Sequence, residues 1–190
     1  MNTYDLILLV VSEEHESKLV GRTLLQKKIY FLNELLHGPI RFSPHNYGPF
    51  SPQVARAVDS LVAAGILNEE AEKVIPLEMP WGESTRYQYV IKDKQEISKI
   101  VRKNAPKEYD AALSSLQKLN SRPEAQDYRT LSIAAKVHQI LRLKGKLKKS
   151  EFPKEARKLG WRNLRKPDID KAVEFLSSLE LLTLSKSQSR

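Results

Sequence analysis

VARAVDSLVAAGILN, residues 54–68, decides the fold, because it is an amphipathic helix that runs directly into an apolar exit. Apolar residues at i, i+3, i+4 and i+7 indicate one buried helix face, and Gly65-Ile66-Leu67 then leads into a short strand. The third helix of a winged helix-turn-helix enters its sheet in this way. Residues 169–183, IDKAVEFLSSLELLT, align with this stretch without a gap and share four identities with it: Ala57/Ala172, Val58/Val173, Leu61/Leu176 and Leu67/Leu182. A structural repeat and a chance similarity between two amphipathic helices both remain open.

The first half predicts the other parts of a winged helix. Two earlier helices are expected from their apolar stripes, at residues 2–14 and 22–36. A connector at residues 42–52 (FSPHNYGPFSP) contains three prolines and one glycine, and its last two residues can start the third helix. Alternating segments at residues 73–79 and 85–91 predict a β-hairpin in the position of a wing.

The second half predicts a further helical module. Helical patterns cover residues 93–120, and residues 121–127 (SRPEAQD) are the best linker candidate. Three more helices are expected at residues 130–143, 150–159 and 168–179. The predicted fold is therefore mainly α with a small β-hairpin. It comprises a winged-helix-like domain at residues 1–92, connecting helices and a linker at 93–127, and a basic trihelical module at 128–190 that is a candidate second helix-turn-helix.

The composition excludes several classes of protein. A chain of 190 residues with 41% hydrophobic content can bury one core or two small ones. It contains no cysteine, so disulfides, thiolate metal sites and a cysteine nucleophile are excluded. The longest apolar run, residues 6–11, is far shorter than the roughly 20 residues that cross a bilayer, and the N-terminus lacks the basic flank of a signal peptide. We expect a cytoplasmic protein with no membrane partner.

The net charge of +9 is concentrated in the second half. Residues 1–92 carry a formal charge of −2 and residues 93–190 carry +11. Residues 142–166 hold eleven basic residues and only two acidic ones. Such a cluster is typical of phosphate binding, although a solvated lysine-rich face, an acidic protein partner or a membrane surface would also accommodate it. We favour nucleic acid as the partner.

Two motifs in the first half resemble a known family. GRTLLQKKIY at residues 21–30, the turn YGPFS at 47–51 and a helix ending in Gly65-Ile66-Leu67 resemble the YwgA-like proteins, which are related to the Panacea group of SocA-like antitoxin domains. The resemblance covers about residues 1–92. It implies binding of a protein partner, as an antitoxin or proteolytic adaptor, and it brings no catalytic residues. The long basic second half departs from it.

The aromatic residues of these segments are candidates for partner binding. Tyr47 and Phe50 flank a turn that Gly48 and Pro49 make rigid, and the alternative is that they only fix the connector to the core. Trp81, at the tip of the expected hairpin, is harder to bury. Tyr47, Phe50 and Trp81 are therefore the predicted contacts for a protein partner or for a homodimer. Lys27 and Lys28, on the second helix, are expected to be solvated.

Enzyme chemistry has little support in the sequence. Neither GxGxxG nor GxxxxGK[ST] nor GxSxG occurs. The four histidines are scattered, and a metal site from His37, His45 and Glu34 lacks dense ligand spacing. No enzyme activity, cofactor or metal is expected.

The leading hypothesis is a non-enzymatic regulatory protein of the winged-helix or helix-turn-helix class that binds nucleic acid, with duplex DNA as the favoured form, through the basic module. Binding would be dominated by the phosphate backbone, because the putative reading helix is acidic at its start. The predicted contacts are Lys148, Lys149, Lys154, Arg157, Lys158, Arg162, Asn163, Arg165 and Lys166. The alternative is an antitoxin-like or adaptor module that binds a protein.

Overall fold

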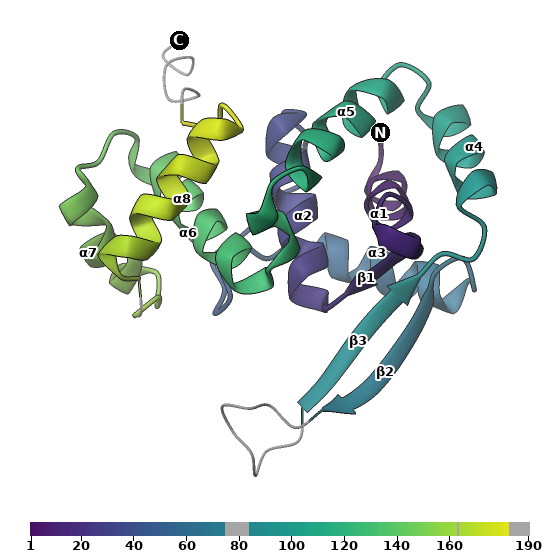
Figure 1. Ribbon diagram of the computed structural model, residues 1–190, viewed down its shortest axis with the longest axis horizontal. Helices are drawn as coiled ribbons and strands as arrows, with labels where there is room; N and C mark the ends of the chain where they lie inside the picture. The colour runs from purple at the N-terminus through teal and green to yellow at the C-terminus, as the bar shows by residue number, and fades with distance from the viewer. Residues whose placement is uncertain (75–83, 163, 183–190) are drawn as a thin grey trace.

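The computed structural model describes residues 1–74, 84–162 and 164–182 of the chain (Figure 1). Its described elements are mainly helices. In chain order they are α1 (Thr3–Ser12), η1 (His15–Ser17), β1 (Lys18–Val20), α2 (Arg22–Leu35), α3 (Pro52–Ala63), β2 (Asn68–Val74), β3 (Ser84–Val90), α4 (Lys94–Asn104), α5 (Tyr109–Asn120), η2 (Pro123–Gln126), α6 (Tyr128–Lys144), η3 (Lys149–Glu151), α7 (Phe152–Lys158) and α8 (Lys166–Ser178). The prediction of a mainly α fold with a small hairpin is confirmed.

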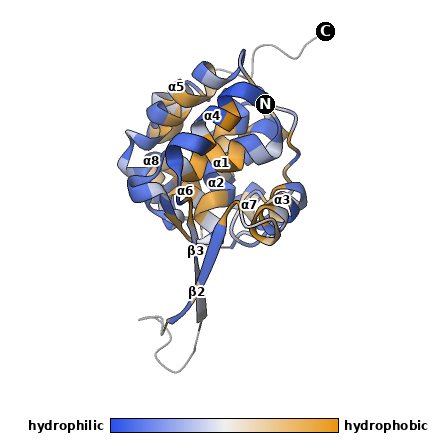
Figure 2. Cartoon of the chain, turned by 90° about the vertical axis from the view of Figure 1, so that its right-hand side faces the viewer, coloured by the Kyte–Doolittle hydropathy of each residue, from blue (hydrophilic) through white to orange (hydrophobic). Residues whose placement is uncertain are grey.

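The first six long elements form a winged helix. The strands make one antiparallel sheet in the order β1-β3-β2, in which Val90 of β3 lies opposite both Lys18 of β1 and Asn68 of β2. The described part of the hairpin projects from the helical body (Figures 1 and 2). The sequence of helices and strands, α1-β1-α2-α3-β2-β3, is that of a winged helix.

The hairpin differs from the sequence prediction in its first strand. The expected strand at residues 85–91 agrees with β3, but the one expected at 73–79 is wrong, because β2 starts at Asn68 and ends at Val74. The β2 sequence NEEAEKV carries polar residues on both faces of an edge strand, so it has no alternation to detect. Strand β1 is only three residues long and was not predicted.

Helices α3 and α8 are built alike from start to end. Each has a proline in its first turn, Pro52 in α3 and Pro167 in α8. Each ends at a residue with positive φ, Gly65 at 70° and Glu180 at 62°. The next amide donates to the carbonyl five positions earlier, at 3.1 Å after α3 and 3.0 Å after α8. The similarity noticed in the sequence therefore extends to both helix ends, after which α3 leads into β2 while residues 179–182 form a turn.

A continuous apolar core connects the two halves of the chain. Helix α1 is buried along its length, as its unbroken apolar sequence requires, and it lies near the centre with α2 (Figure 2). Phe31 of α2 packs edge-on against Phe175 of α8, with ring centroids 5.4 Å apart. The segment between the halves also contributes, because α4 packs on α1, α5 packs on α2, and Ala125 of η2 is buried. The division into a winged-helix domain, a connecting segment and a basic module stays a prediction.

One polar contact lies inside this core. The hydroxyl group of Tyr30 on α2 is 2.7 Å from Nδ1 of His138 on α6, and both side chains are buried. Burial, together with the nearby charge of Arg142, lowers the pKa of His138 to about 4. The imidazole is therefore neutral at pH 7, and the contact is a hydrogen bond between neutral groups.

Candidate nucleic-acid interface and the adjoining cavity

The basic residues predicted to bind nucleic acid lie on η3, on α7, in the following loop and at the start of α8. Every one that the structure describes is exposed, as expected for a binding surface: Lys148, Lys149, Lys154, Arg157, Lys158, Arg162, Arg165 and Lys166. Asn163 lies outside the described residues. Helices α7 and α8 agree with the two helices expected at residues 150–159 and 168–179.

Three of the predicted contacts are paired with carboxylates. Lys149 lies 2.6 Å from Asp170 of α8. Lys158 lies 2.6 Å from Glu155, and Arg165 lies 3.0 Å from Asp168. These lysines lower the pKa values of their partners Glu155 and Asp170, so both carboxylates are ionised at neutral pH. Elsewhere in the window, Arg142 pairs with Glu34 and Lys144 with Glu155.

The rest of the window keeps its positive charge exposed. Six residues form no ion pair with any residue that the structure describes, and we call them the unpaired cations: Lys146, Lys148, Lys154, Arg157, Arg162 and Lys166. The eleven basic residues of the window and the five carboxylates that belong to it or pair with it leave a formal charge of +6. This surface can attract a polyanion without competition from its own acids.

The winged helix of the first half has a different surface. The exposed residues of α3 include Arg56 and Asp59, whose charges cancel. Strand β2, next to it in the chain, exposes Glu70 and Glu72. The helix and wing that would enter a DNA groove therefore carry no excess of positive charge, and phosphate contacts are expected from the second half instead.

Hydrogen bonds join the two motifs of the first half. The side-chain amide of Gln26 on α2 donates to the carbonyl of Ser51 and accepts from the Ser51 amide, both at 3.1 Å. Nζ of Lys27 donates to the carbonyl of Pro49 at 2.6 Å. Gly48 has a φ of +94°, which allows the turn to pass closely over α6. The Leu-Gln-Lys motif thus holds the Tyr-Gly-Pro turn in place.

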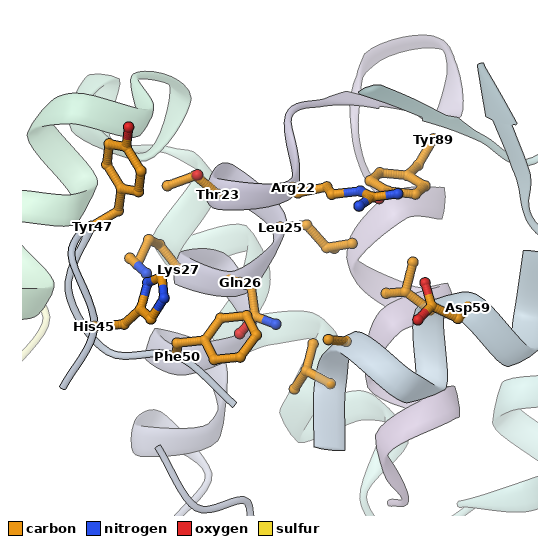
Figure 3. A pocket seen from close by; sticks show the side chains of 13 residues that line it. Arg22, Thr23, Leu25, Gln26, Lys27, His45, Tyr47, Phe50, Asp59 and Tyr89 are labelled. Carbon is orange, nitrogen blue, oxygen red and sulfur yellow. The ribbon is translucent and has the colours of Figure 1, made fainter. Parts of the chain in front are cut away.

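A cavity of about 240 Å³ lies between α2, the connector and α3 (Figure 3). Lys27, His45 and Phe50 lie at one end, and Arg22 and Tyr89 lie at the other. Apolar side chains line the space between these ends: Leu25, Val54, Ala55 and Val58.

The predicted partner-binding residues have different environments. Tyr47 is exposed, with 59% of its surface accessible, and it lies at the cavity. Phe50 is half-buried and packs against the His45 ring at 5.1 Å, so it also fixes the connector to the protein. Trp81 lies outside the described residues. The structure thus brings Tyr47 and Phe50 together at one cavity.

Two adjacent lysines of α2 are buried, contrary to the expectation that both are solvated. Lys28 pairs with Glu14, and Asn120 also accepts from its amino group, at 3.0 Å. Burial lowers the pKa of Lys28, and Glu14 opposes that shift. For Lys27, burial and the like charge of Lys136 lower the pKa to about 8. Consecutive helix residues were expected to face solvent because charge alone was considered, but α2 is covered on most sides by other elements.

The cavity and the basic surface meet at Trp161. Its indole Nε1 donates to the carbonyl of His45 at 2.6 Å, and its side chain is buried. The amino group of Lys136 lies 5.6 Å from the centre of its ring. Sequence reasoning did not single out Trp161. A large aromatic residue inside a basic loop was the available signal, because such a side chain needs a surface to pack on.

The comparisons with known proteins add no family assignment. No family model matches the chain, and a search of curated proteins found no similar one. Among the residues that the structure describes, no helix is long and apolar enough to cross a membrane. In the same residues, histidine and carboxylate side chains form no group of three that could hold a metal ion.

Proposed function

We propose that this protein is a non-enzymatic nucleic-acid-binding protein that uses the second half of its chain to hold a phosphate backbone. The observation that carries the proposal is the set of six unpaired cations, all exposed, on consecutive elements from the end of α6 to the start of α8. Lysine and arginine that release counter-ions from phosphate provide most of the affinity in non-specific complexes.

The start of α8 favours backbone contact over base reading. In a helix-turn-helix, the N-terminal residues of the second helix approach the base edges. Here Asp168 lies in that first turn, and Glu174 is exposed further along α8. Carboxylates at these positions repel phosphate, so weak, largely sequence-independent binding of micromolar strength is expected at physiological salt.

Fluorescence anisotropy with a short mixed-sequence duplex tests this proposal. If all six unpaired cations contact phosphate, the association constant falls about a thousandfold between 50 and 200 mM salt. An RNA duplex of the same sequence shows whether the sugar matters. Absence of binding to either duplex at low salt would refute the proposal and leave the antitoxin-like or adaptor alternative.

Two triple variants with equal loss of charge sharpen the test. One neutralises three unpaired cations, and the other neutralises three paired ones: Lys154→Gln, Arg157→Gln, Arg162→Gln against Lys149→Gln, Lys158→Gln, Arg165→Gln. Replacing the unpaired set should reduce the slope of log K against log salt by about 0.9 for each lost phosphate contact. The paired set should change it less. Equal slopes in the two variants would show that binding follows net charge and that the unpaired cations make no particular contacts.

A further inference from the structure

The cavity beside α2 has two unlike ends. At the far end, Arg22 has partners inside the protein, because it donates to Glu69 at 3.1 Å and to the Tyr89 hydroxyl group at 3.2 Å. At the near end, the buried amino group of Lys27 has the Pro49 carbonyl as its recorded hydrogen-bond partner. An ammonium group has three donors, so two are available there. A ligand therefore finds donors at the near end and a completed polar network at the far end.

Lys27 lacks the counter-ion that its neighbour has. Lys28 is buried to the same degree but faces Glu14. The charged group that acts on Lys27 among the described residues is another cation, Lys136. A buried charge without an opposite charge is costly, and it is usually found where a ligand completes the pair. With a pKa of about 8, the Lys27 amine is mostly protonated at pH 7 and so presents a positive charge to the cavity.

The middle of the cavity suits an apolar group. Leu25, Val54 and Val58 form its wall, and each is buried. Phe50 adds an aromatic face at the Lys27 end. The volume of about 240 Å³ is below the range of about 300–1,000 Å³ that drug-sized ligands occupy. The space therefore fits a small molecule or the last residue of a peptide.

We propose that this cavity binds an apolar carboxylate, with the carboxylate on Lys27 and the apolar body against α3. The carboxylate supplies the missing counter-ion, and its hydrocarbon part replaces water on the wall. A small free acid and the C-terminal residue of a peptide share this chemistry. The site goes beyond nucleic-acid binding and does not depend on it.

Calorimetric titration of the full chain with matched probes tests the proposal. Phenylacetate carries the proposed chemistry, phenylacetamide lacks only the charge, and acetate lacks the apolar body. Phenylacetate should bind at least about tenfold more tightly than the amide, because a buried charge-assisted hydrogen bond is lost in the amide. Tighter binding of N-acetyl-glycyl-phenylalanine than of phenylacetate would identify a peptide terminus as the source. Equal binding of acid and amide, or no saturable binding of either acid, would overturn the proposal.

Two variants separate the charge from the space. Lys27→Met keeps the length of the side chain but removes the ammonium group, so the preference for acid over amide should disappear. Ala55→Phe fills the cavity from a half-buried position on α3 and leaves Lys27 in place, so both probes should lose binding. Urea unfolding checks that each variant is folded. Should Lys27→Met fail to fold, retained binding of phenylacetate by Ala55→Phe still refutes the site.

Discussion

Replacing His138 by asparagine should make the protein less sensitive to acid. The buried imidazole accepts or donates one hydrogen bond, to Tyr30, at the contact between α2 and α6. Asparagine places a polar atom near the position of Nδ1 but cannot bind a proton in this pH range. The variant therefore removes the titration while keeping a partner for the Tyr30 hydroxyl group.

The sign and size of the effect follow from the pKa of His138, which is about 4 in the folded protein against a usual 6.5. Between these values the unfolded chain binds a proton that the folded protein does not, so the free energy of unfolding falls as the pH falls. The loss begins near pH 6.5 and continues to about pH 4. Between pH 7 and pH 5 it amounts to about 2 kcal/mol.

Urea unfolding followed by circular dichroism at pH 7, 6 and 5 measures this loss. Wild type should lose about 2 kcal/mol more than His138→Asn between pH 7 and pH 5, because the contributions of all other groups are common to both proteins. The exposed His15 gives a matched control, and His15→Asn should behave as the wild type. Parallel pH dependences for wild type and His138→Asn would refute the assignment of a neutral buried histidine.

Three further substitutions test the packing, each by urea unfolding at pH 7. Glu14→Gln leaves the buried Lys28 without its carboxylate and should cost about 3–5 kcal/mol, whereas adding Lys28→Met should recover most of this loss. Gly48→Ala adds a Cβ 3.2 Å from a backbone oxygen of α6 and should cost more than Gly65→Ala, which has positive φ but open space and should cost about 1–2 kcal/mol. Phe175→Ala should cost about 3–5 kcal/mol, and a loss below 1 kcal/mol would show that α8 is not part of the common core.

The helices could be predicted from the sequence because each buries one stripe of apolar residues. Residues 54–63 show this best, where Val54, Val58 and Leu61 are buried and the helix ends one residue before Ala64. The strands were harder, since β2 is polar on both faces and β1 is too short for a pattern. What places these strands is pairing with β3, and this depends on residues far away in the chain.

The candidate sites were predictable in position but not in detail. The charge of residues 142–166 located the basic surface, yet Lys149 is neutralised by Asp170, which lies 21 residues further along the chain. The burial of Lys27 could not be read from an α2 sequence in which the lysine is flanked by Gln26 and another lysine. Its environment is created by the connector and by α6, and neither contact has a local sequence signal.

The close approach at Gly48 means that the two motifs do not shape the cavity alone. The turn rests on the backbone of Ser132, and the carbonyl of His45 is held by the indole of Trp161. Both supports come from beyond residue 92, although every motif residue precedes it. A relative that shares only the motifs could therefore present a differently shaped pocket. Inheritance of the motif and inheritance of ligand preference would then be separate events in the history of such proteins.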